Sequence, residues 1–199
     1  MEGYLVMILI FLPVFAAALA LALHKAYKAL SQSPTAVAPQ ELTRFLTFGG
    51  IVNKKLRALS LFFHVTIIIS LSGHFFMFVK DVPPVLPTVG TALGLTATTA
   101  LALLVGRRLS EKDREYLLIS SLLLLTIATG TAMGLVVPRE YVVETALSLP
   151  RTLDMTSLLL TIHVICATAT AAAVPHTLMS HVAAPITYLA VKARRLEKA

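Results

Sequence analysis

Tryptophan is absent from the chain, and cysteine occurs only once, at Cys166. A lone cysteine excludes a disulfide bond within the chain and an iron–sulfur cluster held by the chain's own thiolates. Without tryptophan, anchoring at a membrane interface depends on tyrosine, lysine and arginine. Charged residues are also scarce: they make up 14% of the sequence, whereas a soluble domain carries about a quarter. This scarcity argues against a soluble protein.

Apolar residues take the place of the missing charge. Hydrophobic residues make up 57% of the chain, and the mean hydropathy is +0.83. We expect an all-α integral membrane protein, a bundle of five transmembrane helices in which residues 1–199 form a single domain. The expected spans cover residues of about 4–23, 59–79, 88–105, 116–137 and 153–174, the last with an apolar continuation to about 190. The first span is interpreted as a retained helix rather than a signal peptide, because no basic residue precedes it.

Basic residues are distributed unevenly over the segments between these spans. Of the 17 lysines and arginines, all but Lys80, Arg139 and Arg151 fall after the first span, after the third span or in the C-terminal tail. Positively charged segments stay in the cytoplasm, so we expect the N-terminus outside and the C-terminus in the cytoplasm of a cell membrane that the chain crosses several times. The same distribution explains the net charge of +7 without a nucleic-acid partner.

Histidines stand out in two of the expected spans. His64 and His74 lie in the second span, His163 lies in the fifth, and His176 and His181 lie in its continuation. Ionisable residues inside a membrane are costly and mark functional sites. Two histidine-bearing helices that face each other are consistent with bis-histidine haem ligation. If these helices are antiparallel, His74 pairs with His163, and His64 pairs with a histidine of the continuation.

Helical geometry leaves the fourth ligand open. His181 shares a helix face with His163, but it lies roughly 27 Å further along a straight helix, against roughly 15 Å between the two histidines of the second span. His176 fits the rise better, at roughly 20 Å, but it points about 140° away from His163. A break at Pro175 would shorten the path to His181.

The sequence around these histidines resembles a known family. The second histidine lies in SGHFF ten residues after the first, and a later pair eighteen residues apart ends in PHTLMSHVAAPITYL. Together with the charged loop RRLSEKDR and the helix LLISSLLLLTIATGTAMGL, these segments resemble the gamma subunit of respiratory nitrate reductases, a dihaem cytochrome b. The resemblance covers about Leu59 to Arg195. The same family includes membrane cytochromes of heterodisulfide reductases and of sulfite-reduction-associated complexes.

The resemblance implies two b haems, an inner one held by His64 and His181 and an outer one held by His74 and His163. It favours His181 over His176, because the family usually has an aromatic residue at the latter position. It also implies the electron-transfer, quinol-oxidising subunit of a respiratory oxidoreductase, with no site for nitrate or a similar substrate in this chain. Electrons would pass from quinol through both haems to a cytoplasmic-side iron–sulfur subunit, and through it to a catalytic subunit.

The outer haem is the expected entry point for electrons, because it lies farther from the cytoplasmic partner. Gly73 would let a quinone ring approach, although close helix or porphyrin packing explains this glycine equally well. The nitrate reductase members carry a lysine near the start of the third helix, where this chain has Val89 and Gly90. Lys80 and Arg151 are the candidate replacements, because either could hydrogen-bond a quinone oxygen.

Other functions fit the same pattern of buried histidines. A membrane transporter or proton channel could use them as proton relays. A quinone-reducing cytochrome b of a heterodisulfide or sulfite-linked complex would carry electrons in the opposite direction. A bare membrane anchor would keep the helices without haem, and a visible spectrum separates the haem proteins from the others.

Overall fold

The computed structural model describes residues 4–32, 44, 47, 49, 51–79, 81–111, 114–147, 154–176, 187, 188 and 191. Over these residues the chain forms helices and no β-strand. Within them, the helices long and apolar enough to cross a membrane are Leu9–Gln32, Lys54–Phe76, Val85–Ser110, Tyr116–Val136 and Met155–His176. The expectation of an all-α chain with five such helices is confirmed, and it indicates a multi-pass membrane protein.

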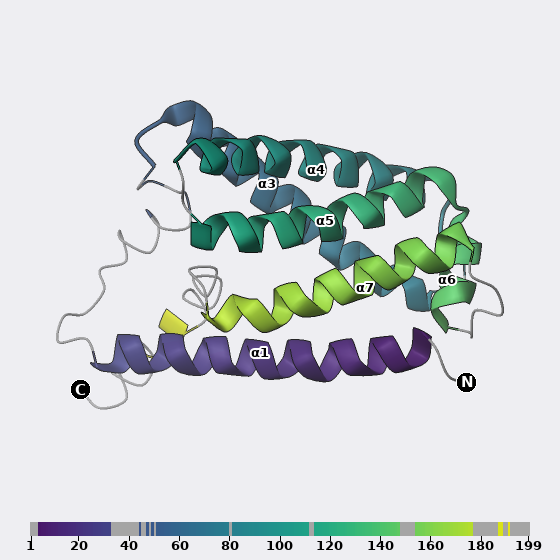
Figure 1. Ribbon diagram of the computed structural model, residues 1–199, viewed down its shortest axis with the longest axis horizontal. Helices are drawn as coiled ribbons and strands as arrows, with labels where there is room; N and C mark the ends of the chain where they lie inside the picture. The colour runs from purple at the N-terminus through teal and green to yellow at the C-terminus, as the bar shows by residue number, and fades with distance from the viewer. Residues whose placement is uncertain are drawn as a thin grey trace.

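The described helices are α1 (Tyr4–Gln32), α3 (Lys54–Gly73), α4 (Val85–Glu111), α5 (Arg114–Val136), α6 (Arg139–Leu147) and α7 (Met155–Ala173). Two short 3-10 helices, η1 (His74–Phe78) and η2 (Val174–His176), directly continue α3 and α7. Figure 1 shows α7 between α1 and α5, with α4 on the other side of α5. The helix α3 packs on α4, and α6 lies at one end of the bundle against α1 and α7 (Figure 1).

Side-chain caps fix the starts of the two histidine-bearing helices. The Asn53 side-chain oxygen accepts hydrogen bonds from the backbone N–H groups of Lys55 (3.0 Å) and Leu56 (3.2 Å) at the start of α3. The Asp154 carboxylate accepts a hydrogen bond from the N–H of Ser157 (2.7 Å) at the start of α7. Because Asn53 caps it, α3 begins earlier than the span expected from hydropathy.

Two other boundaries differ from the expectation. The helix α1 runs to Gln32 instead of ending near Leu23, because HKAYKALSQ is rich in good helix formers, and it ends shortly before Pro34. The segment after Pro138 lies between two expected spans, but it forms α6, and the Pro138 carbonyl accepts hydrogen bonds from its first turn. The continuation expected after the last span lies largely outside the described residues.

Large apolar side chains cover much of the surface of α3. Its exposed hydrophobic residues are Leu61, Phe62, Val65, Ile68, Ile69 and Leu71. A soluble monomer rarely exposes so continuous an apolar face, whereas lipid tails are as apolar as these side chains. The surface therefore agrees with a membrane environment for this helix.

Glycine and threonine bring α4 and α5 close together. A Cβ atom built on Gly94 would lie 2.6 Å from Thr131 Oγ1, and one built on Gly134 would lie 2.6 Å from Thr91 Oγ1. The Thr91 hydroxyl also donates a hydrogen bond to the Gly134 carbonyl (3.1 Å). Small residues at such contacts let the backbones of membrane helices approach one another closely.

We expect Gly94→Ala to lower the thermal stability of the purified protein, because the added methyl group overpacks the contact with Thr131 at a cost of about 1–3 kcal/mol. This cost exceeds the gain of at most about 1 kcal/mol that alanine brings to a helix over glycine. Gly90→Ala on the same helix is the matched control, because a Cβ atom there meets nothing within 4 Å. Thermal unfolding in detergent measures the difference, and equal melting temperatures for the two variants would contradict a tight α4–α5 contact.

Candidate histidine site

The structure brings His74 and His163 together. His74 is the first residue of η1, and His163 lies within α7. The planes of the two imidazole rings differ by 11°, and the ring centroids are 6.1 Å apart. These are the two histidines that the sequence pairs at one end of the bundle. Their approach joins elements that are far apart in the chain.

The two histidines of α3 and η1 are oriented by the helix that carries them. His64 Nδ1 lies 2.7 Å from the Ser60 carbonyl oxygen, and His74 Nδ1 lies 3.1 Å from the Ser70 carbonyl oxygen. A carbonyl can only accept a hydrogen bond, so Nδ1 carries the proton in each ring. Metal-ligating histidines are oriented in this way by a hydrogen bond to the nitrogen that does not bind the metal.

The orientation of His163 depends instead on α5. Its Nδ1 donates to the Thr126 carbonyl (2.8 Å) and lies 3.3 Å from Thr129 Oγ1. The Thr129 hydroxyl itself donates to the Leu125 (2.8 Å) and Thr126 (2.9 Å) carbonyls of its own helix. A Cβ atom on Gly130 would lie only 3.0 Å from His163 Cε1. Gly130 therefore makes room for the ring, and the Thr126 carbonyl sets its direction.

Sequence reasoning did not assign a role to the α5 residues around His163. Thr126, Thr129 and Gly130 are spaced three and four residues apart, which puts them on one face of a helix. A face of threonine and glycine opposite a histidine-bearing span is the signal that would have found them.

Ser70 carries the buried side-chain oxygen that has no hydrogen-bond partner within the described part of the chain. Other hydroxyls of α3 behave differently: those of Thr66 (3.0 Å) and Ser72 (3.0 Å) donate to the carbonyl one turn earlier. Ser70 lies four residues before His74, so the two residues share a face of the helix. The Ser70 hydroxyl thus offers a hydrogen bond one turn from the histidine pair.

The remaining candidate residues are described only in part. His64 packs edge-on against Phe63, with ring centroids 5.3 Å apart. Its expected partner His181 lies outside the described residues, as do Lys80 and Arg151. Gly73 is exposed, and a Cβ atom there would meet nothing within 4 Å.

His176, the alternative fourth ligand, is exposed at the end of η2. Its Nδ1 lies 3.5 Å from Lys25 Nζ, and that ammonium donates to the Pro175 carbonyl (2.9 Å). The ring is therefore held near the end of α1.

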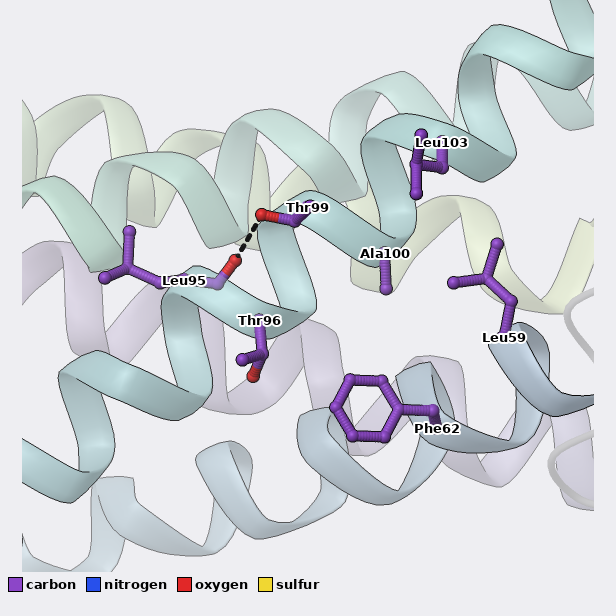
Figure 2. Close-up of a pocket in the computed structure, with 7 residues that line it drawn as sticks. All are labelled: Leu59, Phe62, Leu95, Thr96, Thr99, Ala100 and Leu103. Atoms are coloured by element: carbon purple, nitrogen blue, oxygen red, sulfur yellow. Dashed lines mark hydrogen bonds between the residues drawn. The ribbon is translucent and has the colours of Figure 1, made fainter.

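A shallow apolar groove between α3 and α4 lies apart from this chemistry. Figure 2 shows its lining residues, which are Leu59, Phe62, Leu95, Thr96, Thr99, Ala100 and Leu103. It has a volume of about 280 Å³. Its two threonine hydroxyls already donate to the Leu93 (2.8 Å) and Leu95 (2.9 Å) carbonyls. None of its lining side chains titrates, so the groove suits hydrocarbon rather than a reacting group.

The described histidines meet as a pair rather than as a larger cluster. No group of three or more His, Cys, Asp or Glu side chains suited to a metal ion occurs in the described residues.

Compared with protein-family models, with curated proteins and with solved structures, the chain matches none of them.

We expect the neutral rings of His64, His74 and His163 to carry their proton on Nδ1, because each Nδ1 faces a carbonyl. His176 provides an internal control, because its Nδ1 faces the Lys25 ammonium, which can only donate. Its neutral ring should therefore carry the proton on Nε2. Nitrogen NMR of haem-free protein labelled at histidine distinguishes the two tautomers, and one tautomer shared by all four rings would contradict these hydrogen bonds.

Proposed function

We propose that the chain is the membrane cytochrome b subunit of a respiratory oxidoreductase, similar to the nitrate reductase gamma subunit, and that it binds two b haems. The His74–His163 pair carries this proposal. A transition metal binds an imidazole nitrogen at about 2 Å, so two imidazoles that share one ion have to lie close together. The two rings are stacked with centroids 6.1 Å apart, so His74 and His163 lie near enough for both to hold one haem iron.

The surroundings of the pair also fit a bound haem. The carbonyls of Ser70 and Thr126 hold Nδ1 of the two rings, which leaves Nε2 as the nitrogen suited to the metal. A buried hydroxyl without a partner is unfavourable, and the Ser70 hydroxyl could donate to a polar group of a bound cofactor. When bound, haem supplies one-electron redox chemistry, and the protein contributes the ligands, the hydrogen bonds and a low dielectric.

We assign the second haem to His64. Its Nδ1 is held by the Ser60 carbonyl in the same manner as that of His74 is held by Ser70. The resemblance to the nitrate reductase gamma family gives His181 as the second ligand. The contact between His176 and Lys25 supports this choice, because it engages His176 with a basic side chain.

The direction of electron flow follows from the expected topology. We propose that the N-terminus faces outward and the C-terminus faces the cytoplasm, because basic residues concentrate in the segments assigned to the cytoplasm. Quinol is then oxidised at the outer haem, near Gly73, with Lys80 or Arg151 as the candidate hydrogen-bond donor. Electrons pass to the inner haem and leave for an iron–sulfur subunit on the cytoplasmic face, which serves a catalytic subunit.

We expect the purified protein to show b-type absorption and to contain haem in a ratio near two per chain. His74→Ala or His163→Ala should remove the outer haem and leave the inner one, because each change deletes one axial ligand of one iron. His64→Ala or His181→Ala should have the converse effect. Haem quantitation and redox difference spectra measure both outcomes.

His176→Ala is the control for these variants, and it should keep both haems. Loss of a haem from His176→Ala, with both haems kept in His181→Ala, would reverse the assignment of the fourth ligand. A reproducible ratio of one haem per chain would overturn the pairing of the histidines. A folded but colourless protein would favour a transporter, a proton channel or a bare anchor.

We expect Gly73→Leu to slow haem reduction by a quinol analogue about tenfold or more, equivalent to about 1.4 kcal/mol, while both haems stay bound. The variant should still fold, because a Cβ atom on Gly73 meets nothing within 4 Å. The leucine side chain would then occupy the space through which a quinol approaches His74. Gly106→Leu is the matched control, because Gly106 is another open glycine and lies toward the end of α4 away from η1. Unchanged kinetics in Gly73→Leu and in Lys80→Ala would move the quinol site to the inner leaflet beside His64.

A further inference from the structure

The short helix α6 is attached to α7 in two ways. A buried apolar cluster joins α5, α6 and α7, and it consists of Met133, Ala146 and Leu160 with Val142, Leu159 and Val164 packed around it. At the start of α7, the Tyr141 hydroxyl donates to Asp154 Oδ2 (2.6 Å), while Oδ1 accepts from the Ser157 N–H (2.7 Å). The hydrogen bond between Tyr141 and Asp154 lowers the pKa of the carboxyl and raises the pKa of the phenol. The contact therefore persists at neutral pH.

Arg139, the first residue of α6, links this helix to the segment that begins with His74. Its Nη2 donates hydrogen bonds to the carbonyls of Phe76 (2.6 Å) and Val79 (2.7 Å). The Phe76 carbonyl also accepts the Val79 N–H (3.1 Å), so Arg139 is its second donor, and a cation at the end of a helix complements the helix dipole. Hydrogen bonds from a charged donor are roughly twice as strong as neutral ones. Arg139 thus holds the far end of η1.

The side chains of η1 pack little against the rest of the protein, so they contribute little to keeping η1 in place. The side chains of Phe75 and Phe78 are 75% and 73% exposed, respectively. Along the described residues, α3 packs mainly on α4, while α7 packs mainly on α5 and α1. His74 and His163 therefore meet without an extensive interface between α3 and α7, and α6 supplies a connection between the two elements that carry them.

We propose that Arg139 is a positioning residue that sets the His74 ring against the His163 ring. The apolar cluster and the Tyr141–Asp154 hydrogen bond fix α6 on α7. Arg139 of α6 in turn holds η1, so the position of η1 depends on that of α7. Loss of the guanidinium removes the hydrogen bonds that join η1 to α6. The part of this proposal that concerns haem rests on the proposed function, whereas the contact between Arg139 and η1 does not.

The test compares Arg139→Gln and Arg139→Lys with the matched control Arg108→Gln in the full-length protein. Arg108 is also engaged, with its guanidinium carbon 3.9 Å from the centre of the Tyr116 ring, but it lies at the opposite end of α4 from the η1 connection. The first measurement is hydrogen–deuterium exchange of the amides of residues 74–79, which requires no haem. Arg139→Gln should raise their exchange rate about tenfold, since a charged hydrogen bond that closes the segment is lost.

Arg139→Lys should give an intermediate exchange rate, because lysine keeps the charge but lacks the rigid guanidinium. Arg108→Gln should match the unmodified protein. Equal exchange in Arg139→Gln and the unmodified protein overturns the proposal, as does an equal increase in Arg108→Gln.

The second measurement is the low-spin EPR signal of the outer haem, which depends on the angle between the two axial imidazole planes. Arg139→Gln should shift this signal and leave the inner haem's signal unchanged, while Arg108→Gln should leave both unchanged. An unshifted outer signal with haem bound overturns the positioning role. If the unmodified protein binds no haem, the proposed function fails, and the exchange measurement alone then decides whether Arg139 holds η1.

Discussion

Hydrocarbon offers no water to the two nitrogens of a buried imidazole, so the protein has to supply their partners. His64, His74 and His163 each give their Nδ1 proton to a backbone carbonyl, but the source of that carbonyl differs. His64 and His74 use the preceding turn of their own helix, so their ring directions follow from local structure. His163 uses Thr126 of α5, so its direction depends on how α5 and α7 pack. The packing of three helices is therefore part of the geometry of a single pair of rings.

Residue type and segment length were enough to predict the five spans, because crossing a bilayer requires about 20 apolar residues whatever their neighbours are. The approach of His74 and His163 was also predictable, since antiparallel helices bring residues of similar membrane depth together. The existence of α6 was not, because its hold on the bundle comes from Met133 and Leu160, which lie outside its own sequence. The partner of His163 is a backbone carbonyl, which every residue has, so the sequence points to it only through the helix face that Thr126 shares with Thr129 and Gly130.

Basic side chains bind backbone carbonyls at both 3-10 helices. Each continues a histidine-bearing helix, and each has a carbonyl bound by a basic side chain from a distant element. Arg139 binds Phe76 and Val79 after η1, and Lys25 binds Pro175 in η2. Basic side chains can hydrogen-bond the last carbonyls of a helix, and a charged donor forms a stronger hydrogen bond than a neutral one. Lys25, which contributes to the charge distribution that predicts the topology, therefore also binds a carbonyl at the end of a helix. Arg139 does the same after η1.

The packing of α1 on α7 has a consequence for biosynthesis. The first helix docks mainly on the last one, and the hydrogen bond from Lys25 to Pro175 joins residues 150 positions apart. Bringing together residues so far apart in the chain costs conformational entropy, and contacts offset this cost only after they have formed. During synthesis the face of α1 that will meet α7 lacks this partner until the ribosome has delivered α7. The helix α1 is thus among the last of the described helices to find its place, and a chain cut short before α7 leaves it without its main neighbour.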